Sequence, residues 1–235
     1  MKYYAIIVAG GSGSRMQADI PKQFLLLNGK PILMHTLEAF YNSTFKPELI
    51  LVLNVDFHSY WEQLCREHQF IIPHILVKAG NQRFYSVKNG LKKVSGTALV
   101  AIHDAVRPLV SEDLITRSYQ EAERYGNAIA AVKSKDSIRQ INASGSVPLN
   151  REGIFLVQTP QVFQSALLKK AYQQPYRIEF TDDATVVEKT GTIIRIITGD
   201  NRNIKITYPE DILLAQFYLT ASRNNSMPAK TANID

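Results

Sequence analysis

The stretch IIVAGGSGSRM (residues 6–16) decides the fold, because an apolar run of strand-forming residues stops there at two glycines. Small polar residues follow, Arg15 closes the segment, and a second cation, Lys22, comes shortly after it in PKQF (21–24). A glycine-rich loop after a buried strand lets consecutive backbone N–H groups face an anion, since no Cβ blocks the approach. We therefore predict a phosphate-binding loop at the end of the first strand.

Outward from this loop, apolar β-rich runs alternate with segments of helical periodicity. We expect strands over 3–9, 48–54, 73–79, 97–104 and 127–134, and helices over 31–43, 57–70, 83–94 and 111–126. Near-continuous apolar strands separated by helices indicate a parallel sheet that is covered on both faces. The predicted fold class is therefore α/β, a Rossmann-like and mostly parallel sheet, which binds ligands outside the carboxyl ends of its strands.

The alternation breaks at residues 135–152, which read as two polar, extended pieces around NASGS. A hairpin with so little apolar surface cannot bury itself, so we expect an arm that projects and needs a partner. The α/β pattern then resumes, and we expect strands over 153–163, 192–199 and 203–209 and helices over 165–174, 181–191 and 209–222. No linker separates two cores, so we expect one domain over 1–223 and a disordered tail over 224–235.

Composition limits the class of partner. The chain has 235 residues with 27 Lys and Arg against 21 Asp and Glu, a formal net charge of +6. A basic balance favours anionic partners, but no polybasic block is present, so small anionic substrates rank ahead of nucleic acid. No apolar run approaches the roughly 18 residues that a membrane span needs. Cys65 is the single cysteine, which excludes an internal disulfide and fits the cytoplasm.

Two familiar phosphate loops do not fit the first glycine-rich segment. The Walker pattern lacks its lysine, and the dinucleotide fingerprint would place Met16 at its third glycine. The whole segment VAGGSGSRMQADIPKQFLLLNGKPIL (8–33) instead resembles the signature loop of nucleotidylyltransferases, which join a nucleoside triphosphate to a sugar or polyol phosphate. The resemblance implies that Arg15 and Lys22 hold the charge of the triphosphate. It also implies that the loop residues wrap the triphosphate, namely Ala9, Gly10, Gly11 and Gly13.

A second segment narrows the family. AGNQRFYSVKNGL (79–91) resembles the GG-x-x-R-x-x-S-V segment of the 2-C-methyl-D-erythritol 4-phosphate cytidylyltransferases, where this loop recognises the cytosine ring. The residues that the resemblance assigns to the nucleotide are Gly80, Asn81, Arg83 and Ser86. Ala79 departs from the usual first glycine, and Asn81 stands where an aspartate is frequent. The Asn81 side chain still offers a carbonyl acceptor to the amino group of a base.

AIHDAVRP (101–108) is the next match. Asp104 ends a parallel strand, where ligands bind, and the resemblance implies that it coordinates Mg²⁺ and contacts the polyol. A carboxylate together with phosphate oxygens is how proteins usually hold Mg²⁺. We expect Arg107 to have a structural role or to pair with an acid. We interpret His103 as a core residue, because a phosphate monoester is already a competent nucleophile near neutral pH and needs no general base.

The remaining matches concern the arm and the end of the chain. In the resembled family an arm crosses to the second subunit of a homodimer and completes its substrate site, which assigns Ser137 and Arg151 to the polyol phosphate and 135–152 to dimerisation. Thr181 is predicted to cap a helix whose N-terminus binds the same phosphate. In NIKITYP the resemblance makes Lys205 the lysine that reaches both reacting phosphates, and we expect it on a strand.

The resemblance implies a Mg²⁺-dependent, cytoplasmic, homodimeric enzyme that transfers CMP from CTP to 2-C-methyl-D-erythritol 4-phosphate, with no nucleic-acid or membrane partner. The nearest alternative is a ribitol-5-phosphate cytidylyltransferase, which shares the loop, the HDAVRP type of segment and the NIKIT motif. The other alternative is a non-catalytic nucleotide-binding protein on the same scaffold. Retention of cations suited to pyrophosphate departure argues against that alternative.

Overall fold

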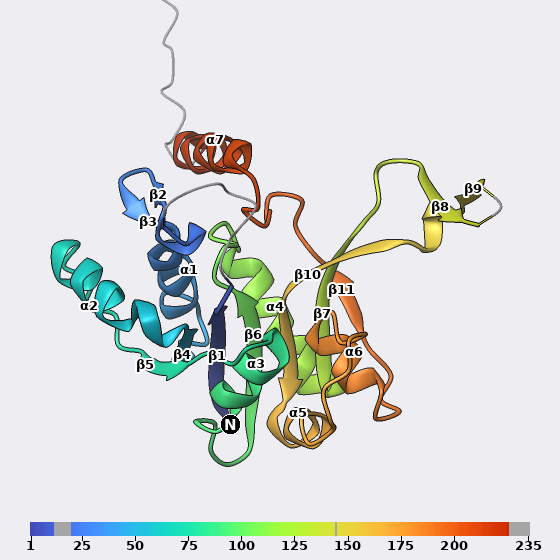
Figure 1. The fold of residues 1–235 in the computed structure, drawn as a ribbon, viewed down its shortest axis with the longest axis horizontal. Helices are drawn as coiled ribbons and strands as arrows, with labels where there is room; N and C mark the ends of the chain where they lie inside the picture. Colours follow the sequence, from blue (N-terminus) through green and yellow to red (C-terminus); the bar gives the residue numbers. More distant parts are fainter. Residues whose placement is uncertain (12–19, 144, 226–235) are drawn as a thin grey trace, which may run out of the picture.

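The computed structural model describes residues 1–11, 20–143 and 145–225. Its centre is a seven-stranded sheet with the strand order β11-β7-β10-β6-β1-β4-β5 (Figure 1). The strands are β1 (Lys2–Ala9), β4 (Glu48–Leu53), β5 (Ile75–Lys78), β6 (Ala98–Asp104), β7 (Asn127–Lys133), β10 (Phe155–Gln164) and β11 (Ile196–Thr198). Two short strands, β2 (Leu26–Leu27) and β3 (Lys30–Pro31), pair separately.

The sheet is mostly parallel, which confirms the predicted fold class. β1 pairs in parallel with both β4 and β6, and β5 and β11 extend the sheet in parallel at its two edges. β10 is the exception, because it runs antiparallel to β6 and to β7. The reversal follows from the chain path: β7 leaves the sheet into the arm, and the chain returns beside β7 as the second half of a long hairpin.

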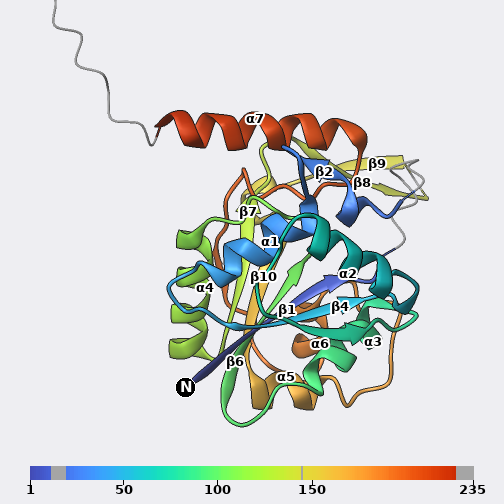
Figure 2. The same cartoon turned by 90° about the vertical axis from the view of Figure 1, so that its left-hand side faces the viewer.

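Helices cover both faces of the sheet (Figure 1, Figure 2). One face packs against α1 (Ile32–Tyr41), α2 (His58–Glu67) and α4 (Glu112–Tyr125), and the other against α3 (Arg83–Leu91), α5 (Ser165–Ala171) and α6 (Asp183–Glu188). The alternation of side chains along β1 divides the two cores: Ala5 and Ile7 belong to the first, Tyr4 and Ile6 to the second. All four are buried.

Local sequence signals mark the ends of several helices. Ser111 caps α4 by accepting a hydrogen bond from the N–H of Leu114 at 3.2 Å, and Gly126 ends the helix with a φ of 88°. Pro209 is the first residue of α7 (Pro209–Asn225), which lies beyond the carboxyl-end edge of the sheet (Figure 2). α7 packs through Ala215 onto a small cluster that includes Ile206.

One sequence prediction near the C-terminus was wrong. Residues 203–209 form no strand; the segment is held by single contacts instead, such as the hydrogen bond from the N–H of Ile206 to the carbonyl of Val106 at 2.9 Å. The predicted strand 192–199 is present but shorter, as β11. α7 continues through residue 225, beyond the predicted helix 209–222, and most of the predicted tail, residues 226–235, lies outside the described part.

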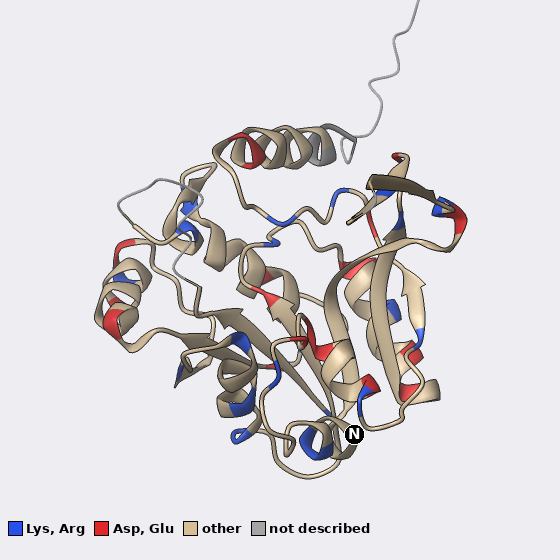
Figure 3. Ribbon diagram, turned by 45° about the vertical axis from the view of Figure 1, so that its right-hand side comes forward, with Lys and Arg blue, Asp and Glu red and all other residues tan. Residues whose placement is uncertain are grey.

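The arm is a two-stranded sheet of β8 (Ile138–Asn142) and β9 (Gly145–Leu149), and it projects from the body of the protein (Figure 1). A short 3-10 helix, Arg151–Gly153, leads from it back to β10. Basic and acidic residues are spread over many elements (Figure 3). Within the described ranges, no helix has the length and apolar character needed to cross a membrane.

Candidate active site

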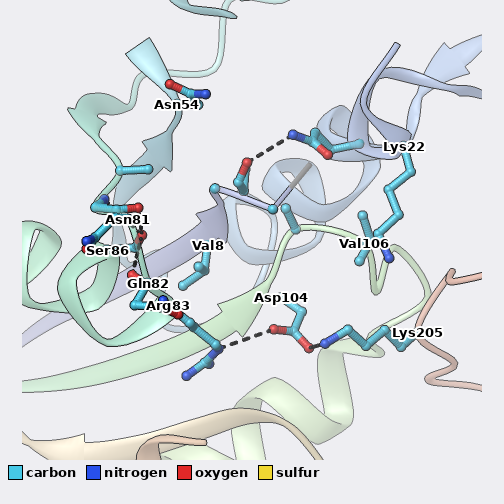
Figure 4. A pocket seen from close by; sticks show the side chains of 17 residues that line it. Val8, Lys22, Asn54, Asn81, Gln82, Arg83, Ser86, Asp104, Val106 and Lys205 are labelled. Atoms are coloured by element: carbon cyan, nitrogen blue, oxygen red, sulfur yellow. Dashed lines mark hydrogen bonds and ion pairs between the residues drawn. The ribbon is translucent and has the colours of Figure 1, made fainter. Parts of the chain in front are cut away.

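A cavity of about 730 Å³ opens at the carboxyl ends of β1 and β6 (Figure 4). The structure gathers most of the sequence-predicted site residues around it. Those that line the cavity are Ala9, Gly10, Gly11, Lys22, Gly80, Asn81, Arg83, Ser86, Asp104 and Lys205. Gly13 and Arg15 lie outside the described residues. The arrangement brings a glycine-rich loop, a second loop and two lysines to one edge of the sheet, where a parallel sheet binds its ligands.

The two loops touch, and glycines permit the contact. A Cβ on Gly10 would lie 2.9 Å from the Cβ of Ala79 and 3.2 Å from Ser86 Oγ. A Cβ on Gly80 would run into the side chain of Tyr85. Ser86 Oγ accepts a hydrogen bond from the N–H of Gly80 at 3.0 Å and donates to the carbonyl of Gln82 at 3.1 Å, so it closes the second loop on itself.

Asp104 is the electrostatic centre of the cavity (Figure 4). Its Oδ2 lies 2.9 Å from Lys205 Nζ and 3.4 Å from Arg107 Nε, and its Oδ1 lies 3.8 Å from Arg83 Nε. Burial alone would raise the pKa of Asp104, but the charges of Arg83, Lys205 and Arg107 outweigh it and hold this pKa far below its usual range. The carboxylate is therefore an anion that three cations surround.

Buried polar groups fix the strand end that carries Asp104. Arg107 pairs with Asp104, as the sequence predicted, and its Nη1 also donates to the carbonyl of Asn203 at 2.8 Å. The N–H of Asp104 donates to Thr159 Oγ1 at 3.1 Å, and Asn203 Nδ2 donates to the carbonyl of Thr159 at 2.7 Å. No sequence pattern pointed to Thr159 or Asn203, because both reach the site through the tertiary fold.

The two lysines of the cavity meet at the segment that precedes α7. Lys22 begins the 3-10 helix Lys22–Phe24, and its Nζ donates to the carbonyl of Ile206 at 2.8 Å. Lys205 directly precedes Ile206 in the chain. Its side chain is 43% exposed and points toward Asp104 (Figure 4). Gln23, which is buried, donates from Nε2 to the carbonyl of Ala9 at 2.9 Å and so ties the 3-10 helix to the glycine-rich loop.

His103 and Cys65 are both unsuited to acid–base or nucleophilic work here. His103 is completely buried, and burial lowers its pKa to about 4, so the ring is neutral near pH 7. Its Nε2 lies 3.1 Å from the carbonyl oxygen of Arg107. Burial, followed by the charge of Glu62, raises the pKa of the Cys65 thiol to about 11. These findings agree with the interpretation of His103 as a core residue.

Three predicted residues stand apart from the cavity. Ser137 and Arg151 belong to the arm, where both are exposed, and Arg151 Nη1 donates to the carbonyl of Lys135 at 3.0 Å. Thr181 is exposed too, and it does not cap α6 as predicted. Asp182 caps it, since its Oδ1 accepts from the N–H of Thr185 at 2.8 Å. Threonine and aspartate are both favourable at a helix N-cap, but α6 begins at Asp183, so Thr181 lies one residue before the cap position.

A buried acid that no sequence pattern revealed also lies beside the cavity. Asp183 accepts a hydrogen bond from Arg83 Nη2 at 2.6 Å and one from the hydroxyl of Tyr172 at 2.5 Å. Its motif, TDDAT, resembles an ordinary helix start, and 100 residues separate it from Arg83. No local signal could have found this pair.

Comparison with known proteins agrees with this geometry. The sequence model of the IspD family, 2-C-methyl-D-erythritol 4-phosphate cytidylyltransferase, matches residues 3–221. A protein of that name from Bacteroides fragilis is 46% identical over 92% of this chain and 98% of its own length. Another, from Azobacteroides pseudotrichonymphae, is 49% identical over 91% of this chain and 96% of its own.

Solved structures give the same result. The 4-diphosphocytidyl-2C-methyl-D-erythritol synthase from Anaerococcus prevotii superposes with a TM-score of 0.80 at 29% identity, covering 93% of this chain and 96% of that one. The 2-C-methyl-D-erythritol 4-phosphate cytidylyltransferase from Thermus thermophilus superposes with a TM-score of 0.76 at 28% identity, covering 94% and 100%. With nearly the whole sequence matched, the chain belongs to the 2-C-methyl-D-erythritol 4-phosphate cytidylyltransferase family.

Proposed function

We propose that this protein transfers CMP from CTP to 2-C-methyl-D-erythritol 4-phosphate, giving 4-diphosphocytidyl-2-C-methyl-D-erythritol and pyrophosphate. The observation that carries the proposal is the convergence of Lys22, Lys205 and Asp104 on one cavity, in a chain that matches this family over residues 3–221. A glycine-rich loop beside fixed cations is what a triphosphate substrate requires.

The reaction is a single displacement at phosphorus. An oxygen of the polyol phosphate attacks the α-phosphorus of CTP, a new P–O bond forms, and the bond to the pyrophosphate oxygen breaks. Charge spreads over the phosphate oxygens in the transition state, so positioned cations are the main catalytic requirement. Backbone N–H groups of Gly10 and Gly11 receive the triphosphate, and Lys22 and Lys205 stabilise the developing charge. Arg15 is assigned to the same task by the sequence pattern.

Asp104 is the candidate ligand for Mg²⁺. Among the described residues, no group of three or more His, Cys, Asp or Glu side chains gathers into a ready-made metal site. Mg²⁺ does not need one, because it commonly binds through one or two carboxylates together with substrate phosphates and water. The single ionised carboxylate of Asp104, on the wall of the cavity, fits that requirement. A bound Mg²⁺ would supply further neutralisation of phosphate charge.

The arm supports a homodimer in which each subunit completes the site of the other. Ser137 and Arg151 offer a hydroxyl and a guanidinium that suit a phosphate monoester, yet neither lines the cavity of its own chain. Apolar side chains of the arm are also exposed, including Ile141 at 77%. Thr181 remains a proposed phosphate contact, on the evidence of its hydroxyl and its place directly before the cap of α6.

A complementation experiment tests the shared site. Lys205→Ala removes a cavity lysine and keeps the arm, whereas Arg151→Ala keeps the cavity and alters the arm. We expect both variants to be nearly inactive alone and the mixture, after subunit exchange, to recover about a quarter of wild-type turnover, because a mixed dimer has one intact site. No recovery in a mixture that native mass spectrometry shows to contain mixed dimers would contradict the shared site.

The activity itself is tested by pyrophosphate release with Mg²⁺ and CTP, run in parallel with 2-C-methyl-D-erythritol 4-phosphate and with ribitol 5-phosphate. We expect release with the first substrate. Release with ribitol 5-phosphate alone would move the protein to the alternative polyol while keeping every site residue. If neither substrate led to pyrophosphate release from a folded protein that still binds CTP, the protein would be a nucleotide-binding protein without this activity.

A further inference from the structure

Arg83 is shared between two carboxylates, one on the wall of the cavity and one behind it. Its Nη2 donates to Asp183 Oδ2 at 2.6 Å, whereas its Nε lies 3.8 Å from Asp104 Oδ1. The Asp183 side chain has 0% exposure, and the Arg83 side chain is 28% exposed. The shorter and more buried contact of Arg83 is therefore made with Asp183, which does not line the cavity.

Asp183 is itself held in place by a buried tyrosine. The hydroxyl of Tyr172 donates to Asp183 Oδ1 at 2.5 Å, so each carboxylate oxygen has a strong donor of its own. The Tyr172 ring stacks on Phe84 with 4.8 Å between centroids, and Phe84 stacks on Phe180 at 5.6 Å. Burial and the charge of Asp183 raise the pKa of Tyr172 well above its usual value, so its hydroxyl keeps the donated proton.

The guanidinium of Arg83 would behave differently without this restraint. Burial alone would lower the pKa of Arg83, but the charges of Asp183 and Asp104 raise it, so the group is a permanent cation. Its five donors form a rigid fork that pairs readily with a carboxylate through two parallel bonds. Asp104 lies within reach and already has Lys205 and Arg107 as partners. With Asp183 gone, a two-bond pair between Arg83 and Asp104 becomes the best remaining arrangement.

We propose that Asp183 is a positioning residue that holds Arg83 back from Asp104 and so keeps the Asp104 carboxylate available to the acceptor substrate. The inference rests on the proposed function and on the expectation, from the family resemblance, that Asp104 contacts the polyol. Arg83 then serves the acceptor side of the cavity, although it begins the helix that follows the nucleotide loop. Neutralising Asp183 should therefore weaken use of the acceptor and spare CTP.

Steady-state kinetics of Asp183→Asn test the proposal. We expect KM for 2-C-methyl-D-erythritol 4-phosphate to rise about tenfold or more, as for a lost hydrogen bond to a charged group, while KM for CTP changes less than threefold. Tyr172→Phe removes one donor to Asp183 and keeps the ring stack, so it should shift the same KM in the same direction by less. An unchanged KM for the polyol phosphate, or a rise in KM for CTP alone, would overturn the proposal.

The neighbouring acid provides a matched control. Asp182 caps α6 and accepts from Gln161 Nε2 at 3.0 Å, but it makes no ion pair with Arg83 among the described contacts. Asparagine caps a helix about as well as aspartate, so Asp182→Asn should leave both KM values unchanged. A purely structural role for Asp183 would lower the melting temperature without separating the two KM values.

A spectroscopic readout separates this proposal from the proposed function. The Nε–H group of Arg83 should give a sharp, slowly exchanging ¹⁵N–¹H signal in the substrate-free protein, assigned by its loss in Arg83→Lys. We expect Asp183→Asn to shift that signal, because Nε would then donate to Asp104, and we expect a smaller shift in Tyr172→Phe. The Tyr172→Phe variant provides the test if Asp183→Asn does not fold. An unchanged signal would refute the restraint even in an active enzyme. If wild-type protein releases no pyrophosphate, the same spectra still decide whether Asp183 holds Arg83.

Discussion

The sheet edge around Asp104 and the projecting arm are opposite kinds of structure. At the sheet edge, Asp104 has three cationic partners, and its backbone is tied to Thr159 within a buried network. In the arm, β8 and β9 pair only with each other among the described strands, and most of their side chains are exposed. The same chain therefore supplies one set of functional groups inside a buried network and another on an exposed hairpin.

The difference matches the roles that we propose for the two sets. Cations that stabilise a transition state act best when the fold holds them in place beforehand, because reorganising them during the reaction would cost free energy. In the proposed homodimer the arm completes the site of a second subunit, so its groups lie away from their own core. Changes at the sheet edge should therefore affect the chemistry of their own chain, whereas changes in the arm should leave the stability of their own chain almost unchanged.

The largest effect should come from Lys205→Ala. We expect kcat to fall by roughly 10²–10³-fold, in line with the loss of other preorganised charge stabilisers. The melting temperature should change little, because Asp104 keeps Arg83 and Arg107. Lys92→Ala is the control, since this exposed lysine at the end of α3 contacts only Asn89 within the described contacts. Near-normal turnover in Lys205→Ala would remove this lysine from the mechanism.

The contact between the two nucleotide loops should give the next largest effect. A Cβ on Gly10 would crowd Ala79, so Gly10→Ala should lower the free energy of unfolding by about 1–3 kcal/mol, as overpacking does, and weaken CTP binding. The double variant Gly10→Ala, Ala79→Gly should recover most of the lost stability and most of the lost CTP affinity, because the space between the loops holds one Cβ, at position 10 or at position 79. Calorimetric titration with CTP and thermal unfolding measure the two quantities.

Gly11 is the matched control for stability at this loop. A Cβ there meets no atom of the described residues within 4 Å, so Gly11→Ala should leave the unfolding free energy within about 0.5 kcal/mol of wild type. If the double variant were no better than Gly10→Ala, then Ala79 would not be the group that excludes a side chain at position 10. In that case the contact with Ser86 would be the remaining cause.

His103 should make stability depend on pH. The unfolded chain binds a proton to this ring below pH 6.5, whereas the buried ring resists protonation until about pH 4. Because the unfolded state binds the extra proton, stability is complete above pH 6.5 and declines as pH falls from 6.5 to 4, by at most about 3 kcal/mol. Urea unfolding across this range should show the decline, and His103→Gln should flatten it. Parallel curves for the two proteins would contradict this assignment.

The smallest effect should come from the arm. Arg139 Nε donates to Ser146 Oγ at 2.7 Å, but both residues are exposed. We expect Arg139→Ala to change the free energy of unfolding by no more than about 0.5 kcal/mol, the usual range for surface positions. Chemical denaturation at low protein concentration measures it. A loss comparable to that of Gly10→Ala would mean that the arm is energetically part of the body, and the contrast between the two regions would disappear.

Much of the fold was predictable because its signals are local. Apolar periodicity located the strands β1, β4, β6 and β7 and the four helices among them, and Ser111 and Gly126 marked the ends of α4. The exposed hairpin was equally readable from its polar composition. The prediction failed over 203–209, where an alternating apolar pattern suggested a strand. The pattern correctly indicated that Ile206 is buried. It could not indicate that this segment pairs with no strand among the described residues.

The sequence by itself determined the classes of chemical group and their place along the chain: a glycine-rich loop, lysines at 22 and 205, and a carboxylate at the end of β6. Only the tertiary structure decided which groups meet. It joined Lys22 to the carbonyl of Ile206 across 184 positions and Arg83 to Asp183 across 100. Periodicity and capping arise from interactions between near neighbours, whereas contacts between distant residues depend on how the helices and the sheet pack, which no local pattern encodes.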